Sequence, residues 1–256
     1  MKLAAVGLAK RFADGVEALA DVSIELAPGE FVSIVGPSGC GKSTLLAVLA
    51  GLIEPTAGEV LLDGAPPAGG LLGRIGLMPQ RDLLMEWRTT VANAALGLEL
   101  AGVGRLQARE RALAEMGRFG LSGFENRRPS ALSGGMRQRT ALLRTFLAGR
   151  DVLLLDEPFA ALDALTREAM REWLLGVWES DRKTILFVTH DVEEAVFLSD
   201  RVYVMSARPG TIRTAIDVGL PRPRALEVSA TPAFAELKER LLAPLREDAR
   251  AALGAA

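Results

Sequence analysis

The stretch Gly36-Pro37-Ser38-Gly39-Cys40-Gly41-Lys42-Ser43-Thr44 fits the pattern G-x-x-x-x-G-K-[ST] of a phosphate-binding loop. The apolar run 30–35 before it predicts a buried strand, and the run 45–52 after it predicts a helix. A strand that turns through glycines into a helix points backbone N–H groups and the positive end of the helix dipole at one place. The sequence therefore predicts phosphate binding by residues 36–44. Lys42 would supply a cation for the β- and γ-phosphates, and the Ser43 hydroxyl a ligand for Mg²⁺.

The whole chain has the composition of an ordinary globular protein. Its 256 residues are 49% hydrophobic and 24% charged, with a formal net charge of −2, so no basic field indicates nucleic acid. The single cysteine, Cys40, excludes an intrachain disulfide framework and fits a reducing compartment. The N-terminal apolar stretch is too short for a signal peptide, and no apolar run approaches the ~20 residues of a membrane span. We therefore expect any membrane role to come through a partner.

Strand and helix patterns alternate along the chain in a way that predicts its fold. Continuous apolar runs at 152–155, 184–188 and 201–205 are separated by helical segments at 164–180 and 192–198. Such alternation predicts an α/β fold with a parallel sheet covered by helices on both faces.

Two further sections interrupt or follow this core. Helical spacing replaces strand patterns between residues 84 and 149, so we expect a helical subdomain inserted into a core of residues 1–83 and 150–216. Residues 217–256 form a tail whose terminal helix should present one apolar face, made by Phe234, Leu237, Leu241 and Leu245.

An acidic pair follows a buried strand in Val152-Leu153-Leu154-Leu155-Asp156-Glu157-Pro158. Ligands of open α/β sheets bind at the carboxyl ends of the strands, which is where these acids lie. Asp156 is placed to hold Mg²⁺, and Glu157 to polarise the water that attacks a γ-phosphate. The alternative is that the two acids are solvated residues at the start of a loop. The presence of a phosphate-binding loop in the same chain argues against that alternative.

A second glycine-rich helix start occurs in Leu132-Ser133-Gly134-Gly135-Met136-Arg137-Gln138-Arg139. Ser133 is a favourable N-cap, and Gly134 and Gly135 allow close backbone approach. Physical reasoning alone predicts a capped helix that is suited to an anion.

Taken together, these motifs resemble the ATP-binding-cassette ATPases. A phosphate loop, an L-S-G-G-x-x-Q-R segment and a strand that ends in D-E-P occur in the order of that family, over nearly the whole chain. The resemblance implies a P-loop NTPase fold with a RecA-like parallel core, an antiparallel β subdomain and an inserted helical subdomain. It also implies ATP and Mg²⁺ as ligands and ATP hydrolysis as the activity.

The resemblance gives roles to four further residues. Phe12 resembles the aromatic residue that stacks on adenine. Gln80 resembles the glutamine that contacts Mg²⁺ and the attacking water, and His190 the histidine that hydrogen-bonds the γ-phosphate. Asp163, in Ala160-Ala161-Leu162-Asp163, resembles the aspartate that contacts a second copy.

The same resemblance predicts the partners. In this family two copies bind head to tail, so that Ser133, Gly134 and Gly135 of one copy close over the ATP on the phosphate loop of the other. Gln80-Arg81-Asp82-Leu83-Leu84 and Pro221-Arg222-Pro223-Arg224 resemble importer ATPases of the nitrate, sulfonate and taurine type. We therefore expect a membrane permease as partner, an extracytoplasmic solute-binding protein as an indirect one, and a cytoplasmic location on the inner face of the membrane.

The chain departs from the family pattern at Glu86, Ala131 and Ala161, where relatives usually have proline, a polar residue and serine. Three other functions compete with the importer ATPase. A soluble cassette ATPase usually has two cassettes or a long coiled-coil insertion, which this chain lacks. The hypothesis of a P-loop kinase does not explain the segment 132–139. The hypothesis of a non-catalytic cassette does not explain why Lys42 and Glu157 are retained.

Overall fold

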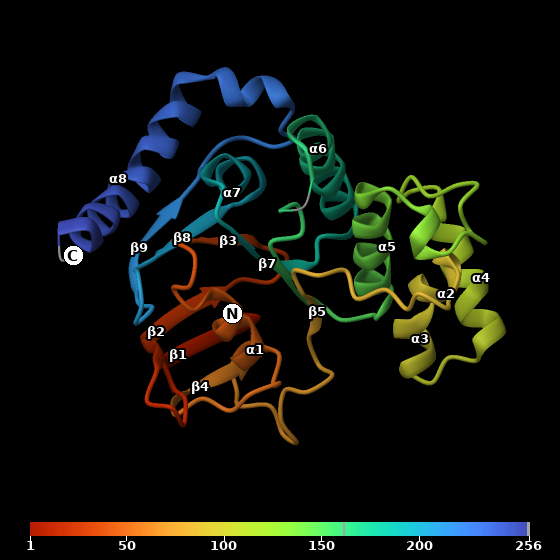
Figure 1. Ribbon diagram of the computed structural model, residues 1–256, viewed down its shortest axis with the longest axis horizontal. Coiled ribbons are helices and arrows are strands. Elements are labelled where there is room, and N and C mark those ends of the chain that lie inside the picture. Colours follow the sequence, from red (N-terminus) through yellow and green to blue (C-terminus); the bar gives the residue numbers. More distant parts are fainter. Residues whose placement is uncertain (161, 255–256) are drawn as a thin grey trace.

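In the computed structural model, which describes residues 1–160 and 162–254, two sheets pack with helices around them (Figure 1). Ala161 lies outside the described residues. An antiparallel sheet has the order β2-β1-β4, and a larger sheet has the order β5-β6-β7-β3-β8-β9. The first sheet contains β1 (Leu3–Arg11), β2 (Glu17–Leu26) and β4 (Ala57–Leu62). The second contains β3 (Phe31–Val35), β5 (Gly76–Met78), β6 (Val152–Asp156), β7 (Thr184–Thr189), β8 (Arg201–Met205) and β9 (Ile212–Asp217).

The larger sheet confirms the predicted parallel core, with one addition. Strands β5, β6, β7, β3 and β8 pair in parallel, whereas β9 pairs antiparallel with β8 at the edge. The sequence analysis did not predict β9, because Ile212-Arg213-Thr214-Ala215-Ile216-Asp217 has only Ile216 fully buried and carries no continuous apolar run.

Alternation of side chains along each central strand explains why both faces of the sheet are covered. Val152 and Leu154 of β6 join a cluster that fills the space between the two sheets around α1 (Lys42–Leu49). Leu153 and Leu155 join a second cluster on the opposite face, which packs against the longer helices. Every residue of β6 is buried, as expected for a strand between two cores.

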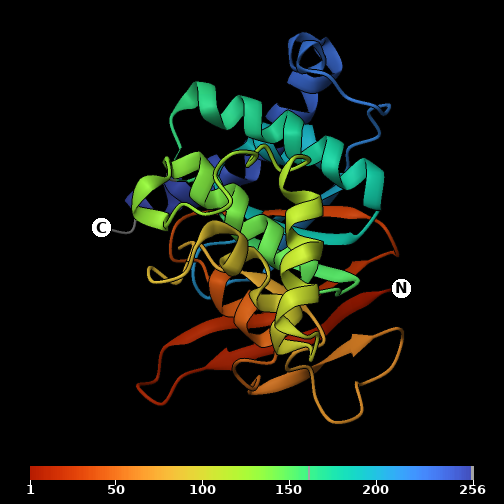
Figure 2. The same cartoon turned by 90° about the vertical axis from the view of Figure 1, so that its right-hand side faces the viewer.

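The helices fall into two groups (Figures 1 and 2). One group covers the face of the larger sheet that is opposite to α1, and it contains α6 (Ala164–Asp181), α7 (Val192–Leu198) and α8 (Pro232–Gly254). The other group lies beside the β5 edge, and it contains α2 (Thr90–Ala94), α3 (Leu96–Leu100), α4 (Arg105–Met116) and α5 (Gly134–Leu147). The second group falls within the section predicted to be helical. The predicted subdomain boundaries at residues 84 and 149 stay a prediction.

The terminal helix has the predicted apolar face. Phe234, Leu237 and Leu241 are buried in the cluster below α8, and Leu245 packs against it. The connection that leads to α8 is also anchored, because the Arg224 guanidinium donates from Nη1 to the carbonyls of Val196, Phe197 and Ser199 at the end of α7. Burial of this guanidinium lowers the pKa of Arg224 to about 10.

The parallel register sets the level at which three functional segments leave the sheet. Val35 of β3 pairs with Thr189 of β7, and Val188 of β7 pairs with Asp156 of β6. The chain therefore leaves β3, β7 and β6 side by side at one edge, just before Gly36, His190 and Glu157.

We predict that Phe187→Ala destabilises the protein by about 3–5 kcal/mol, the range for removing a buried aromatic ring. Phe187 is fully buried in the middle of the sheet, with its ring centroid 5.9 Å from that of Phe31 and 5.6 Å from that of Phe159. Urea unfolding measures the change. Leu106→Ala is the control, because Leu106 is 74% exposed on α4 and should shift stability by less than about 0.5 kcal/mol. Equal shifts for the two variants would contradict this assignment of the core.

Candidate active site at the carboxyl edge of the sheet

The phosphate-binding loop leaves β3 at Gly36 and enters α1 at Lys42, as predicted. Gly39 and Gly41 have φ of 77° and 110°, values that favour glycine. A Cβ on Gly41 would lie 2.6 Å from the Ala18 carbonyl oxygen, so only glycine fits there. Lys42 is buried, and its Nζ donates to the carbonyls of Gly36 at 2.8 Å and Pro37 at 3.0 Å. The loop is thus closed around the ammonium group that is expected to meet phosphate.

Cys40 is the one member of the loop whose side chain faces the core. Its thiol is buried, and burial raises the pKa of Cys40 above the ordinary value of a cysteine. Its thiol is therefore closed to a phosphate, and its backbone N–H donates to the Pro37 carbonyl at 3.3 Å, whereas Ser38, Gly39 and Ser43 are exposed.

A second loop, at 206–210, supports the phosphate loop, and the sequence analysis did not find it. Arg208 Nε donates to the Gly39 carbonyl at 3.1 Å, and Gly210 N donates to the Ala18 carbonyl at 3.0 Å. A Cβ on Gly210 would come within 2.3 Å of the Cys40 carbonyl oxygen. The only signal in the sequence is the turn-forming Arg208-Pro209-Gly210, which does not reveal a contact with residues so far away in the chain.

Asp156 and Ser43 place a carboxylate and a hydroxyl next to each other beside the loop. Burial raises the pKa of Asp156 above the ordinary value of an aspartate, and a hydrogen bond from Ser43 and the charge of Lys42 oppose that shift. A hydroxyl and a carboxylate side by side suit Mg²⁺, which prefers oxygen ligands and often completes its shell with phosphate and water. Among the described residues no group of three or more His, Cys, Asp or Glu side chains forms a metal site. Phosphate oxygens would therefore have to complete the coordination of a metal ion beside Ser43 and Asp156.

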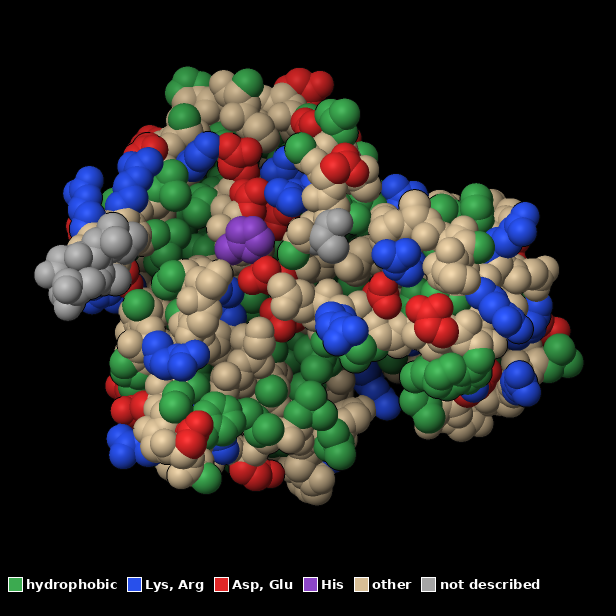
Figure 3. Space-filling view, in the orientation of Figure 1, with side chains coloured by type: hydrophobic (Ala, Val, Ile, Leu, Met, Phe, Trp, Pro, Cys, Tyr) green, Lys and Arg blue, Asp and Glu red, His purple; other side chains and the backbone are tan. Residues whose placement is uncertain are grey.

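Gln80 and His190, two side chains predicted to take part in catalysis, contact the carboxylate of a third, Glu157. Glu157 Oε2 accepts a hydrogen bond from Gln80 Nε2 at 3.3 Å and lies 3.0 Å from His190 Nδ1, which donates to it when the carboxylate is ionised. Figure 3 shows the histidine at the surface beside acidic side chains. Gln80 follows β5, Glu157 follows β6 and His190 follows β7, so the cluster unites three strand ends.

The backbone of Glu157 is strained. Its φ is 43°, in the left-handed region, although it is not a glycine. Its N–H donates to the Val188 carbonyl at 2.9 Å, which holds it against the end of β7. Strain of this kind costs about 1–3 kcal/mol and gathers at functional sites, where the surrounding structure holds it in place. The geometry therefore points to Glu157 as a residue whose position matters.

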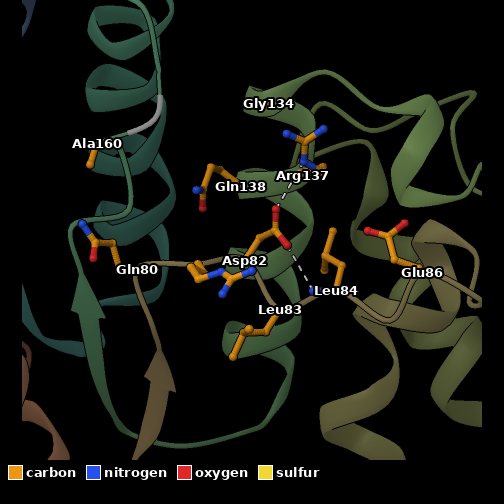
Figure 4. Close-up of a pocket in the computed structure, with 10 residues that line it drawn as sticks. Gln80, Asp82, Leu83, Leu84, Glu86, Gly134, Arg137, Gln138 and Ala160 are labelled. Atoms are coloured by element: carbon orange, nitrogen blue, oxygen red, sulfur yellow. Dashed lines mark hydrogen bonds and ion pairs between the residues drawn. The ribbon is translucent and has the colours of Figure 1, made fainter.

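Two arginines of α5 hold the segment that follows Gln80, and Figure 4 shows one of them, Arg137, beside Asp82. Arg137 Nε lies 3.3 Å from Asp82 Oδ2, and Arg144 donates to the carbonyls of Asp82 at 2.6 Å and Leu83 at 2.8 Å. A cavity of about 680 Å³ lies between this segment, the start of α5 and Ala160. The sequence analysis did not assign a role to either arginine.

The segment 132–139 forms the capped helix that the sequence predicts. Ser133 is the N-cap of α5, and its hydroxyl accepts a hydrogen bond from Met136 N at 3.3 Å. Within residues 1–160 and 162–254, no hydrogen bond links Ser133, Gly134 or Gly135 to the phosphate loop. Within the described part of one copy, the start of α5 is therefore not hydrogen-bonded to the phosphate loop.

Phe12 and Asp163 lie at the margins of the site. Phe12 follows β1 at a tight turn, is 39% exposed, and has Lys10 Nζ 5.5 Å from its ring centroid. The Lys10 ammonium therefore lies over one face of the ring. Asp163 is exposed and caps α6, because its side chain accepts a hydrogen bond from Thr166 N at 3.0 Å.

Comparisons with known proteins agree with this geometry. Residues 19–160 match the ABC transporter family. A putative ATP-binding protein of Brucella abortus is 45% identical over 227 residues, which are 89% of this chain and 87% of that protein. The taurine import ATP-binding protein TauB of Yersinia pestis is 48% identical over 198 residues, 77% of each chain.

A solved structure supports the same family. It is the dimeric post-hydrolysis state of an ATP-binding cassette bound to ADP and Pi, with a TM-score of 0.73, 31% identity, and coverage of 86% of this chain and 100% of that chain. The predicted family, P-loop NTPase fold and ATPase activity are thereby confirmed. The chain belongs to the ABC transporter family and is an ATP-binding cassette with ATPase activity.

Proposed function

We propose that this cassette powers the import of a small solute through a membrane permease, with Glu157 as the group that activates water. The observation that carries the proposal is the convergence of Gln80 and His190 on the Glu157 carboxylate, beside the phosphate loop. A strained, hydrogen-bonded carboxylate at this edge is suited to orient a water molecule toward a γ-phosphate.

Hydrolysis follows from the roles of these three side chains. Glu157 accepts a proton from the water molecule as the water oxygen attacks the γ-phosphorus. The bond between the γ-phosphorus and the β–γ bridging oxygen then breaks. Gln80 and His190 hold the carboxylate in place through their bonds to Oε2. A ring protonated on both nitrogens would also donate from Nε2 to a γ-phosphate oxygen. Lys42 and the N–H groups of residues 39–43 stabilise the charge on the phosphates.

Mg²⁺ would be held by Ser43 and Asp156, where it would neutralise charge on the β- and γ-phosphates. The Gln80 amide nitrogen contacts Glu157, so its amide oxygen is the atom that would reach the metal or the water. These assignments rest on the oxygen donors that the site presents.

A second copy of the chain completes the site in this proposal. Ser133, Gly134 and Gly135 start a 14-residue helix that has no hydrogen bond to the phosphate loop of the same copy among the described residues. Its free N–H groups and helix dipole suit the γ-phosphate that is bound to another copy. The related cassette solved as a dimer with ADP and Pi supports this arrangement.

The permease is proposed to dock in an apolar groove next to the Gln80 segment. The groove measures about 510 Å³, and its lining includes Leu77, Leu83, Met85, Leu96 and Leu100. Such a groove fits the apolar face of a helix. In the segment that follows Gln80, Leu83 and Trp87 are 54% and 72% exposed, whereas Leu84 is buried in the core. Leu84 is therefore not available to a partner on this surface.

The relatives support a proposal for the class of solute and for the location of the chain in the cell. Identity to TauB proteins supports a small solute that is nitrate-, sulfonate- or taurine-like, or a related small organic substrate, delivered by an extracytoplasmic binding protein. None of the described helices has the length and apolar character needed to cross a membrane. We propose that the chain lies on the cytoplasmic face through its permease.

We predict that Glu157→Gln lowers ATP turnover by about 10²–10⁴-fold, the usual contribution of a general base, while ATP still binds. The variant should accumulate as an ATP-bound dimer in size-exclusion chromatography. Glu59→Gln on the exposed edge of β4 is the matched control and should keep wild-type turnover. Wild-type turnover in Glu157→Gln would remove Glu157 from the mechanism.

We predict that Phe12→Ala weakens ATP binding by about 1–3 kcal/mol, or roughly 5- to 150-fold, through loss of adenine stacking. Phe12→Trp should restore affinity, because it also presents a flat aromatic face. Calorimetry with ATP measures the change, and inorganic triphosphate, which has no base, serves as the control ligand. A similar loss of triphosphate affinity would show that Phe12 acts on the loop and not on adenine.

We predict that Met85→Cys crosslinks to a permease subunit in the assembled transporter, because Met85 lines the groove. The wild-type chain is a clean background, since its only cysteine, Cys40, is buried. Leu113→Cys on α4, also partly exposed but outside the groove, is the control. An adduct with Leu113→Cys and none with Met85→Cys would place the permease elsewhere.

A further inference from the structure

The side chain of Arg167, in the first turn of α6, contacts segments on two sides of that helix. Its Nη2 donates to the Leu162 carbonyl at 2.9 Å, in the segment that also carries Asp163. Its Nη1 lies 3.9 Å from Asp191 Oδ2, and its Nε lies 3.7 Å from Glu194 Oε1. One guanidinium therefore lies between the segment 162–163 and the segment that follows His190.

The two acidic partners hold the backbone on each side of His190. Glu194 is only 4% exposed, and its Oε2 accepts a hydrogen bond from Thr189 Oγ1 at 2.6 Å. Thr189 Oγ1 accepts in turn from Asp191 N at 3.0 Å. Asp191 Oδ1 also caps α7 by accepting from the N–H groups of Glu193 and Glu194 at 2.8 and 3.3 Å. Movement of Asp191 and Glu194 would thus carry His190 with it.

The charges make this contact sensitive to the position of Arg167. Burial raises the pKa of Glu194, and the positive charges of Arg167 and Arg171 oppose that shift. The two ion-pair distances of Arg167 exceed the 2.7–3.2 Å of a good N–H···O bond, so both have room to shorten. Among the described residues, the buried Nε of Arg167 has no hydrogen-bond partner and is available to Glu194.

We propose that Arg167 is a positioning residue that couples the segment 162–163 to His190. The inference rests on the proposed function, in which a second copy of the chain contacts Asp163. When that copy moves Leu162 and Asp163, the guanidinium follows its bond to the Leu162 carbonyl and draws Asp191 and Glu194 with it. His190 then shifts relative to Glu157, to which it is hydrogen-bonded. Closure of the dimer thereby changes the position of His190 relative to Glu157 within the same chain.

A purely structural role for Arg167 makes a different prediction. An ion pair that only fastens α6 to α7 would affect stability, whereas a coupling residue affects turnover and cooperativity between the two ATP sites. Arg171 is the matched control, because it lies one turn further along α6 and its charge also acts on Glu194. No hydrogen bond or ion pair joins Arg171 to residues 162–163 within the described ranges.

The test compares Arg167→Met, Arg167→Lys and Arg171→Met in the full chain by steady-state ATP hydrolysis. We expect Arg167→Met to lower kcat by about 10- to 100-fold, the scale of a slight misplacement of catalytic groups, and to change KM for ATP less than about 3-fold. Its Hill coefficient for ATP should fall to 1. Arg167→Lys keeps the charge but has a shorter, single-headed donor, so it should recover part of kcat. Arg171→Met should stay within about 2-fold of wild type in kcat and keep the wild-type Hill coefficient.

Several results would overturn the coupling. These are an equal loss in Arg171→Met, an unchanged Hill coefficient in Arg167→Met, or a wild type whose Hill coefficient is already 1. If Arg167→Met fails to fold by thermal melting, Arg167→Lys carries the comparison by itself, and wild-type behaviour in it contradicts the proposal.

A separate measurement distinguishes this inference from the proposed function. In the Glu157→Gln background, ATP should still produce a dimer when Arg167→Met is added, because Arg167 is not proposed to hold the two copies together. Absence of an ATP-dependent dimer in Glu157→Gln alone would overturn the proposed function itself. A normal dimer combined with normal kinetics in Arg167→Met would overturn only the coupling.

Discussion

The parallel register of β3, β7 and β6 is the constraint on which the rest of the site depends. Pairing of Val35 with Thr189, and of Val188 with Asp156, makes three chain segments leave the sheet at one level. The bond from Glu157 N to the Val188 carbonyl extends this ladder by one residue and keeps Glu157 in its left-handed conformation. Because these strands are buried on both faces, the ladder is shielded from water and the Glu157 carboxylate has a rigid base.

Helix α5 serves two purposes that the sequence does not reveal as connected. Its first residues, Gly134 and Gly135, are suited to the phosphate of a second copy, and Arg137 and Arg144 further along hold the backbone after Gln80. The groove proposed for the permease is bounded by the same Gln80 segment and by Arg144. A partner that moves this segment would therefore act both on the cluster around Glu157 and on the helix proposed to face the second copy.

The sequence predicted the parts of the fold that local patterns encode. Buried strands, the phosphate loop, the capped start of α5 and the apolar face of α8 follow from periodicity and capping rules, and the structure contains all of them. The edge strand β9 and the support of Gly39 by Arg208 were missed, because they depend on pairing between residues distant in the chain.

The parts of the site also differ in how rigidly the surrounding structure holds them. Glu157 and the phosphate loop are fixed by backbone ladders and by glycines that fit against neighbouring carbonyls, so many bonds would have to break together for them to move. The segments around Gln80 and Leu162 lie outside the sheet, and single arginine side chains contribute much of their attachment. Contacts made by one long side chain open at lower free energy than a buried ladder. In the proposals above, the segments that respond to a partner are therefore attached in part by single side chains, whereas the backbone of Glu157, on which they act, is bonded to the end of β7.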